Sequence, residues 1–131
     1  MKNRWLETAV VYGLKNTLCT SEKQFVRTAK KLTKGKAPQT EWVKPTGGGA
    51  RVHFFDDKQG STVCVVCVNG KGRSVAEIAA LLAHEAVHIK QETLLTMGED
   101  KPSDEFEAYI VQNVTQNLMS EYARQKKLRW V

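Results

Sequence analysis

The residue types best suited to chemistry lie next to one another, as His84, Glu85, Ala86, Val87 and His88, an H-E-x-x-H pattern inside a strongly helical segment. Residues four apart lie on one face of an α-helix, so the two imidazoles are directed at one point. Two neutral imidazoles supply half of a tetrahedral Zn²⁺ site. Glu85 lies beside that face, where its carboxylate can take a proton from an activated water without binding the metal. The pattern therefore predicts the centre of a zinc hydrolase.

A catalytic zinc ion needs a third protein ligand and leaves its fourth position to water. The only other histidine, His53, precedes the motif, so no downstream histidine can complete the site. We therefore expect a carboxylate from the last predicted helix, which holds Asp104, Glu105 and Glu107 near its start. The small side chain of Ala108 would let that helix approach the motif closely.

The elements that must position these residues are two long predicted helices. Ser74 begins the first with Glu77 three residues later, a capping box, and the helical pattern runs to about residue 93. Ser103 begins the second, which spans about 104–124 and has acidic residues in its first turn, where the helix dipole favours them.

The first half of the chain supplies the rest of the fold. Residues 4–18 suit either a helix or a strand, and a capped, amphipathic helix is expected over about 21–33. Residues 34–50 contain two prolines and three successive glycines, which is typical of a flexible connector. Residues 50–55 and 61–68 have the alternating pattern of β-strands, and the segment between them has the Asp and Gly residues of a turn, so we expect a β-hairpin. We expect one α+β domain over the whole chain.

Composition limits the class of protein. The chain of 131 residues is 41% hydrophobic and 26% charged, which favours one soluble globular domain over a disordered or membrane protein. No apolar run approaches the ~20 residues of a membrane helix, and no signal-like segment opens the chain, so we expect a cytoplasmic protein. Cys19, Cys64 and Cys67 do not predict a disulfide framework. The last two are three apart in a predicted strand, so they should face opposite sides as small core residues.

Positive charge is concentrated in the first half. Residues 1–50 hold ten lysines and arginines against three glutamates, while residues 51–131 hold ten against eleven acidic residues. A basic half can bind nucleic acid or another anionic partner. No nucleic-acid motif accompanies the charge, and the aromatic residues do not alternate with the lysines, so solvated faces are the favoured explanation. Nucleic-acid binding is the alternative.

A family resemblance rests on the two helices. H-E-x-x-H, followed after a short loop by E-x-x-A in the stretch DEFEAY, resembles gluzincin-type metallopeptidases. The match implies that His84, His88 and Glu105 bind zinc and that Glu85 is the general base. Residues 74–122 are also similar to small phage- and prophage-encoded metallopeptidases. This implies a zincin-like α+β fold, a minimal gluzincin with a short antiparallel sheet packed on the helices and a C-terminal helix carrying the third ligand.

The chain departs from the family at one position. Larger gluzincins place an aspartate four residues after the ligand glutamate, where this chain has Tyr109. Its phenol could orient a zinc histidine or donate to a developing oxyanion, or be a partly buried aromatic side chain without a role. Glu107 is the rival third ligand, but it projects about 200° around the helix from Glu105. For His53, in a strand between apolar neighbours, a satisfied structural histidine is favoured over one that touches substrate.

These observations predict a zinc-dependent peptide-bond hydrolase that uses Zn²⁺, acts on a peptide or protein and has no membrane partner, in the host cytoplasm if phage-encoded. An exposed edge of the hairpin could hold the peptide by strand addition. One alternative is a zinc-binding regulatory module without proteolysis, which the intact Glu85 argues against. Another is a basic nucleic-acid-binding protein with a structural metal. A structural zinc ion usually has four protein ligands, and the sequence offers no fourth candidate.

Overall fold

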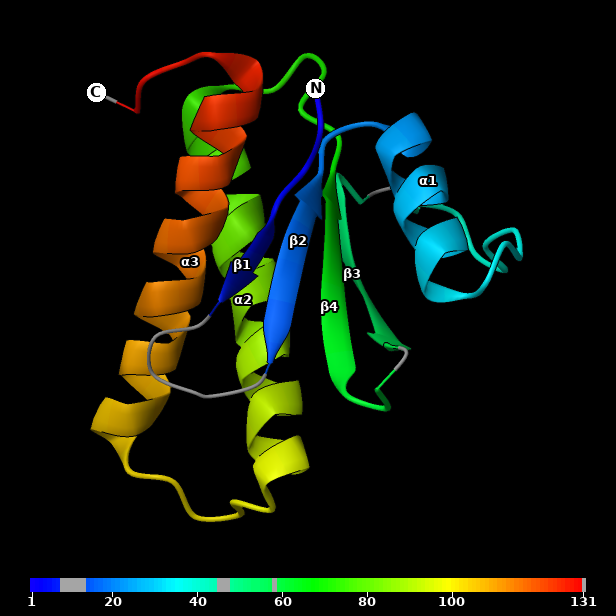
Figure 1. Ribbon diagram of the computed structural model, residues 1–131. Helices are drawn as coiled ribbons and strands as arrows, with labels where there is room; N and C mark the ends of the chain where they lie inside the picture. Colours follow the sequence, from blue (N-terminus) through cyan, green and yellow to red (C-terminus); the bar gives the residue numbers. More distant parts are fainter. Residues whose placement is uncertain (8–13, 45–47, 58, 131) are drawn as a thin grey trace.

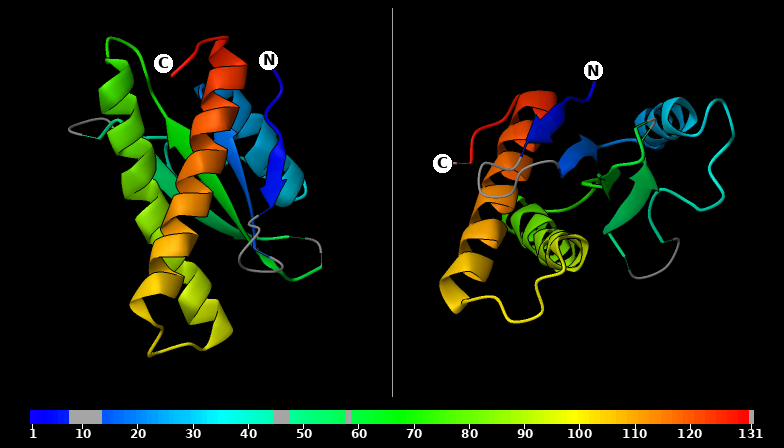
Figure 2. Two further views of the ribbon diagram at one scale, coloured as in Figure 1. Left: turned by 90° about the vertical axis from the view of Figure 1, so that its left-hand side faces the viewer. Right: turned by 60° about the horizontal axis from the view of Figure 1, so that its bottom comes forward.

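The chain folds into three layers, seen in a computed structural model that describes residues 1–7, 14–44, 48–57 and 59–130. A four-stranded mixed sheet forms the middle layer, with two long C-terminal helices on one face and one short helix on the other (Figures 1 and 2). The α+β class expected from the sequence is confirmed. None of the helices in these described ranges combines the length and apolar character needed to cross a bilayer.

The sheet has the strand order β1-β2-β4-β3. Its strands are β1 (Trp5–Glu7), β2 (Lys15–Cys19), β3 (Ala50–Asp56) and β4 (Thr62–Val68). β2 runs parallel to β4, whereas β1 and β3 are antiparallel to their neighbours. The predicted hairpin is therefore present as β3 and β4. The expectation of an antiparallel sheet is wrong: the sheet is mixed, because β2 and β4 are joined by a long connection that includes α1. Among the described residues β3 pairs only with β4, so its other side is an open edge, and it borders the site described below.

The ambiguous N-terminal segment contains two strands, β1 and β2. Of the positions between them, 8–13 lie outside the described residues. In β2, Thr17 and Cys19 face one side of the sheet while Asn16 and Leu18 face the other, and all four are buried. A strand buried on both faces has no apolar–polar alternation, which explains why periodicity alone does not identify it. In the connector, residues 34–44 and 48–49 form neither helix nor strand.

The first helix, α1, spans Glu22–Leu32 and agrees with the predicted range. Ser21 caps it by accepting a hydrogen bond from the Gln24 amide. The side chain of Gln24 accepts from the Thr20 amide. In a capping box the Gln24 side chain would accept from the amide of the N-cap residue, Ser21. Here it accepts from the amide one residue further upstream.

The two long helices also agree with the prediction. α2 spans Val75–Met97, and both hydrogen bonds of its capping box, between Ser74 and Glu77, are present. It ends at Gly98, whose φ of 71° is left-handed, a conformation that glycine adopts without strain. α3 spans Asp104–Lys126 and is capped by Ser103.

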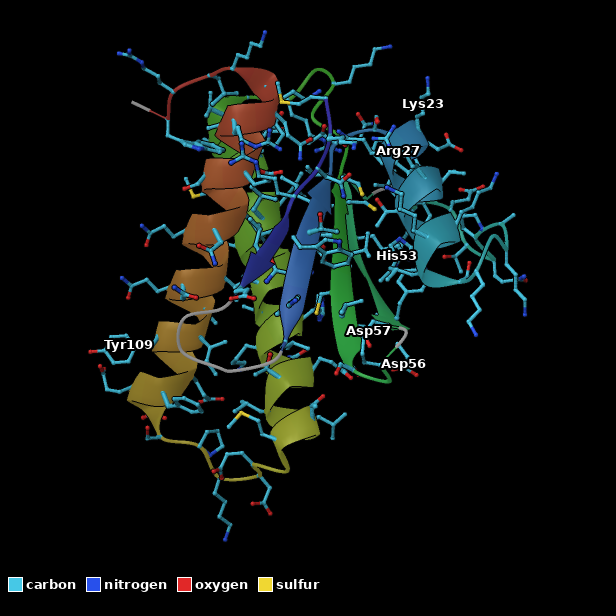
Figure 3. All side chains as sticks on the ribbon, viewed as in Figure 1. Lys23, Arg27, His53, Asp56, Asp57 and Tyr109 are labelled. Carbon is cyan, nitrogen blue, oxygen red and sulfur yellow. The ribbon has the colours of Figure 1, made fainter. Side chains whose placement is uncertain are left out.

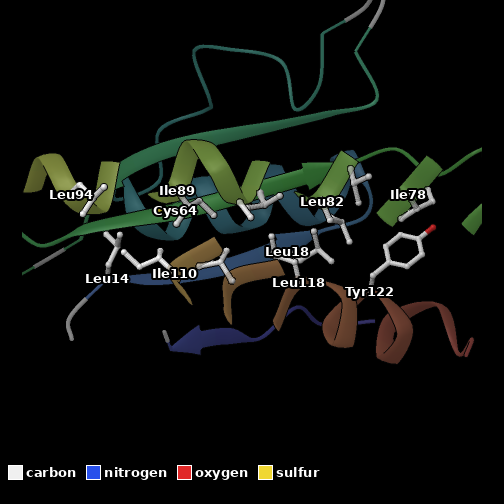
Figure 4. Packing of buried hydrophobic residues seen from close by; sticks show 14 residues of the cluster. Leu14, Leu18, Cys64, Ile78, Leu82, Ile89, Leu94, Ile110, Leu118 and Tyr122 are labelled. Atoms are coloured by element: carbon white, nitrogen blue, oxygen red, sulfur yellow. The ribbon is translucent and has the colours of Figure 1, made fainter. Parts of the chain in front are cut away.

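Two apolar clusters hold the layers together. The larger lies between the sheet and the α2–α3 pair and includes Leu18, Cys64, Leu82 and Leu118 (Figure 4). The smaller lies on the α1 side of the sheet and includes Cys67. Cys64 and Cys67 thus face opposite sides, as expected, and all the cysteines are free and buried. Burial raises the pKa of the Cys64 thiol to about 12.

A buried network of hydrogen bonds links the N-terminal residues to α3. Glu121 accepts hydrogen bonds from the Arg4 amide at 3.1 Å and from the Gln125 side chain at 2.9 Å. Arg124 donates to Glu121 at 2.7 Å and to the Lys2 carbonyl at 2.6 Å. Burial alone would raise the pKa of Glu121, but these hydrogen bonds outweigh it and hold the pKa below its usual range. The residues that lead into β1 are therefore held in place.

Candidate functional site

The H-E-x-x-H residues lie in a groove between α2 and the open edge of β3. The groove has a volume of about 760 Å³. His84, Glu85 and His88 all line it, together with Val52 of β3. Lys44, Gly48 and Gly49 of the connector also line it. The structure therefore combines the motif with a cavity and an unpaired strand edge.

The two histidines approach each other through the nitrogens that would bind a metal. The Nε2 atoms of His84 and His88 are 3.3 Å apart, and both side chains are exposed to the groove. Two nitrogens bound at about 2.0–2.1 Å to a tetrahedral zinc ion are about 3.3–3.4 Å apart. The imidazole pair therefore fits two adjacent vertices of a tetrahedral zinc site.

Gln91 holds the second of these rings. Its Oε1 is 3.1 Å from Nδ1 of His88, and since an amide oxygen can only accept, this contact favours the tautomer with the ring proton on Nδ1. Nε2 of His88 is then unprotonated and directed toward His84, which is the form that binds a metal.

We expect Gln91→Ala to weaken zinc binding by about 10- to 100-fold, because His88 loses the partner that fixes its tautomer and ring orientation. Competition titration against a chromophoric chelator measures this change. Gln91→Glu should keep the acceptor and restore most of the affinity. Equal affinities for Gln91→Ala and the wild-type chain would exclude this role for Gln91.

Glu85 is the buried member of the motif and is only 5% exposed. Burial raises the pKa of its carboxyl group, while the nearby His84 and His88, the Val52 amide and Lys44 act in the opposite direction. A carboxyl group whose pKa is raised toward neutrality is better matched to proton transfer than an exposed one. Glu85 is therefore a buried carboxyl group with a raised pKa, next to the histidine pair and to the Val52 amide of β3.

The histidines and the α3 contact lie on opposite flanks of α2. Its buried side is centred near Leu82 and Ile89. Successive positions on a helix are about 100° apart. His84 and His88 therefore lie to one side of these buried residues, on the surface of α2 that lines the groove. Lys90 lies about 200° around the helix from His88, on the other flank.

α3 meets α2 on that other flank. Lys90 Nζ is 3.2 Å from Glu107 Oε1, an ion pair in which the lysine side chain is mostly buried. α2 and α3 run antiparallel (Figures 1 and 2), so the ion pair also sets their register. Glu105 is then level with about position 92, roughly 6 Å along the axis beyond His88. No residue of α3 is among the described residues that line the groove.

The structure does not bring Glu105, Ala108 or Tyr109 to the histidine pair. Glu105 is exposed, and Glu107, the rival ligand, is paired with Lys90. Tyr109 is 54% exposed and points outward from α3 (Figure 3). Ala108 is exposed as well, so it does not provide the close helix contact expected of it.

Within the described ranges, no three or more His, Cys, Asp or Glu side chains are grouped so that they could hold a metal ion. The positions outside those ranges contain none of these residue types in the sequence. The pair of histidines is therefore the part of the predicted site whose geometry fits zinc.

His53 has a structural environment. It is 8% exposed, its ring stacks on Phe25 at 4.5 Å, and it does not line the groove. Nε2 lies 3.1 Å from the Trp42 carbonyl and Nδ1 lies 3.3 Å from the Thr40 hydroxyl. The carbonyl can only accept, so the ring donates from Nε2 and accepts at Nδ1. The interpretation of His53 as a satisfied structural histidine agrees with these contacts.

We expect His53→Leu to lower the free energy of unfolding by about 1–3 kcal/mol near pH 7.5, because leucine has no polar hydrogen and the carbonyl of Trp42 loses its donor. Burial lowers the pKa of His53, so the neutral ring stabilises the fold above its usual pKa of ~6.5, and this contribution is lost as pH falls through the folded pKa. The difference between the two proteins should therefore shrink toward about pH 5 in urea titrations. A pH-independent difference would contradict the assignment.

Three features of the groove were not predicted from the sequence. Lys44 comes from the connector, and Glu92 and Gln91 come from the turn of α2 after the motif. The contact between Gln91 and His88 could have been predicted, because residues three apart lie on the same face of a helix. Lys44 had no such signal, since its place depends on the tertiary path of the connector.

Comparison with known proteins finds no family model, curated protein or solved structure that matches this chain.

Proposed function

We propose that the chain is a zinc-dependent peptide-bond hydrolase. The observation that carries the proposal is the 3.3 Å separation of the His84 and His88 Nε2 atoms beside the buried Glu85. A structural pair of histidines has no need of a neighbouring carboxyl group that is costly to bury. The same three residues line a groove open to solvent, which gives a substrate access.

Each residue has a separate role in the proposed reaction. His84 and His88 would hold the metal, and a bound zinc ion supplies Lewis-acid activation of a water and of the substrate carbonyl. Glu85 accepts the proton of the attacking water and returns it to the leaving amine. Gln91 keeps His88 in its metal-binding tautomer.

The open edge of β3 is suited to align an extended peptide. Backbone groups of an edge strand point alternately toward and away from its partner, and the Val52 amide is directed at Glu85. The backbone groups of Ala50 and Phe54 share that direction and lie along the groove. Phe54 and Leu95 are 39% and 74% exposed at this surface, which favours apolar side chains in the substrate. The peptide would pair with β3 and pass the histidine pair.

The proposed site departs from the three-ligand site expected from the sequence: it takes no ligand from α3, so the two imidazoles would hold the ion and water or substrate would fill its other positions. We expect Glu105→Ala to change zinc affinity by less than about threefold, compared with at least about 100-fold for loss of either histidine. Glu107→Ala is the matched control, because it removes a carboxylate of the same helix turn that is already paired. A loss for Glu105→Ala as large as for a histidine variant would show that metal binding rearranges α3 and brings in the third ligand implied by the gluzincin resemblance.

The function is tested by cleavage of a peptide library by the purified chain, loaded with zinc and treated with a chelator. The proposal predicts cleavage that is lost with the chelator, restored by zinc and enriched at sites with apolar neighbours. Stoichiometric zinc binding without cleavage of any peptide would favour the non-proteolytic zinc module instead. Cleavage that is unaffected by the chelator would contradict the proposal.

A further inference from the structure

A second cavity lies on the α1 side of the sheet, opposite to the face that α2 and α3 cover. It has a volume of about 500 Å³ and is bordered by β1, β2, β4, α1 and the β3–β4 turn. We call it the α1 pocket. The residues that line it are Lys2, Asn3, Trp5, Lys15, Arg27, Thr28, Lys31, Leu32, Asp57, Gln59 and Val63. None of them belongs to the histidine groove.

The α1 pocket is strongly basic. Lys2, Lys15, Arg27 and Lys31 all line it, against one carboxylate, Asp57. One oxygen of that carboxylate accepts hydrogen bonds from two amides of the turn, at 2.9 Å each, and so is engaged locally. Lys15 forms only a loose ion pair with the exposed Glu7, at 3.9 Å. The four cations therefore remain available to an anionic ligand.

The pocket also holds an exposed indole. Trp5 is 45% exposed although it lies in a strand. It pairs with Thr17 in the sheet and shares the α1 side with Lys15. In the sequence the aromatic residues do not alternate with the lysines, but the fold places Trp5 among four cations from three segments. Aromatic side chains within a basic groove are what proteins use to stack nucleic-acid bases.

The walls of the pocket are held in place before any ligand binds. The Asn3 amide donates to Thr17 at 2.8 Å and to Thr28 at 3.1 Å, which ties the N-terminal segment to both β2 and α1. The carbonyl of Lys2 accepts from Arg124 of α3. A pocket formed in advance costs less ordering entropy when a ligand binds.

The positive charge continues beyond the pocket along α1. Lys23, Arg27, Lys30 and Lys31 lie within an arc of about 100° on the helix and border a shallow apolar hollow (Lys23 and Arg27 are labelled in Figure 3). They span about 12 Å along the helix axis. Glu22 is the one acidic residue bordering this hollow. A chain of phosphates could follow these side chains out of the pocket.

We propose that the α1 pocket binds single-stranded nucleic acid, with a base stacked on Trp5 and backbone phosphates paired with the lysines and Arg27. An acidic peptide would match the charge but offers no base to stack on the indole. A duplex keeps its bases stacked on each other, so they could not enter a recessed pocket. The site lies across the sheet from the histidine groove, so binding there does not depend on zinc.

The test is fluorescence anisotropy with a labelled oligothymidylate of about 15 nucleotides and the full chain, over a range of salt concentrations. We expect log K to fall linearly with log salt with a slope near −2.8 for four cations, about −0.7 each. The double variant Arg27→Ala/Lys31→Ala should bind at least about tenfold more weakly and lose about 1.4 of that slope. The matched control is Lys71→Ala/Lys101→Ala, two exposed lysines on distant turns, which should change affinity less than about threefold.

Stacking is tested at the indole. Trp5→Leu should weaken binding about tenfold or more, while Trp5→Phe, which keeps an aromatic ring, should recover most of the affinity. Thermal unfolding of each variant verifies that the exposed position tolerates the change. The proposal is overturned if both double variants lose affinity equally, or if Trp5→Leu binds like the wild-type chain. Displacement by polyglutamate of equal charge would instead identify a general polyanion site, and equal displacement by thymidine monophosphate a mononucleotide site.

Discussion

Glu85→Gln should lower kcat/KM for peptide hydrolysis by about 10²- to 10⁴-fold, the usual contribution of a general base, while zinc affinity stays within about threefold. The glutamine side chain is nearly identical in size, and its amide oxygen could still accept the hydrogen bond from the Val52 amide. What it lacks is the ability to take a proton. Activity is measured on a peptide cleaved by the wild-type chain, and zinc affinity by competition with a chelator.

The same substitution has a second expected effect, on stability. Burial disfavours the charged form of Glu85, so the uncharged amide should leave the free energy of unfolding of the zinc-free protein equal or higher. Glu92→Gln is the matched control, because it removes a carboxylate from the same groove at a position about two helical turns away. It should reduce kcat/KM by less than about fivefold. Full activity in Glu85→Gln would exclude the base assignment, and a large loss of stability would indicate a structural carboxylate.

Removal of either imidazole should abolish tight zinc binding. We expect His84→Ala and His88→Ala each to weaken zinc affinity by at least about 100-fold, because one nitrogen alone cannot hold the ion. Zinc at about 100 times its dissociation constant stabilises a folded protein by about 2.7 kcal/mol, and both variants should lose this stabilisation. Thermal unfolding with and without zinc measures it.

The control for this experiment is the remaining histidine. His53→Leu should unfold at lower denaturant concentration but keep its zinc affinity, since His53 is buried against Phe25 on the α1 side. The double variant His84→Ala/His88→Ala should be little worse than either single one, because both belong to one site. Independent, additive losses would mean that the two histidines bind zinc separately, which would contradict the proposed pair.

The helices could be predicted because their signals are local. Ser74 and Glu77 identify the start of α2, and Ser103 identifies the start of α3, since a cap depends only on residues within one turn. The histidine pair is local for the same reason, being two positions on one face of one helix. The hairpin of β3 and β4 was also readable, because its two strands are neighbours in sequence.

What could not be predicted depends on contacts between distant segments. β2 pairs in parallel with β4, more than 40 positions away, and no local pattern specifies such a pairing. The place of Glu105 relative to the histidines could not be read from the sequence for a similar reason: helix periodicity gives its angle on α3, but the flank of α2 that α3 covers depends on the Lys90–Glu107 contact and on the core. The nearness of Trp5 to Arg27 likewise follows only from the packing of α1 on the sheet.

The central claim, that His84 and His88 together hold a zinc ion, is tested most directly by X-ray absorption at the zinc edge. The measurement uses the chain after dialysis with one equivalent of zinc. The account predicts one bound zinc ion per chain with two imidazole nitrogens at about 2.0–2.1 Å, and loss of that signal in His88→Ala. A chain that retains no zinc, or whose zinc has no imidazole neighbours, would contradict it.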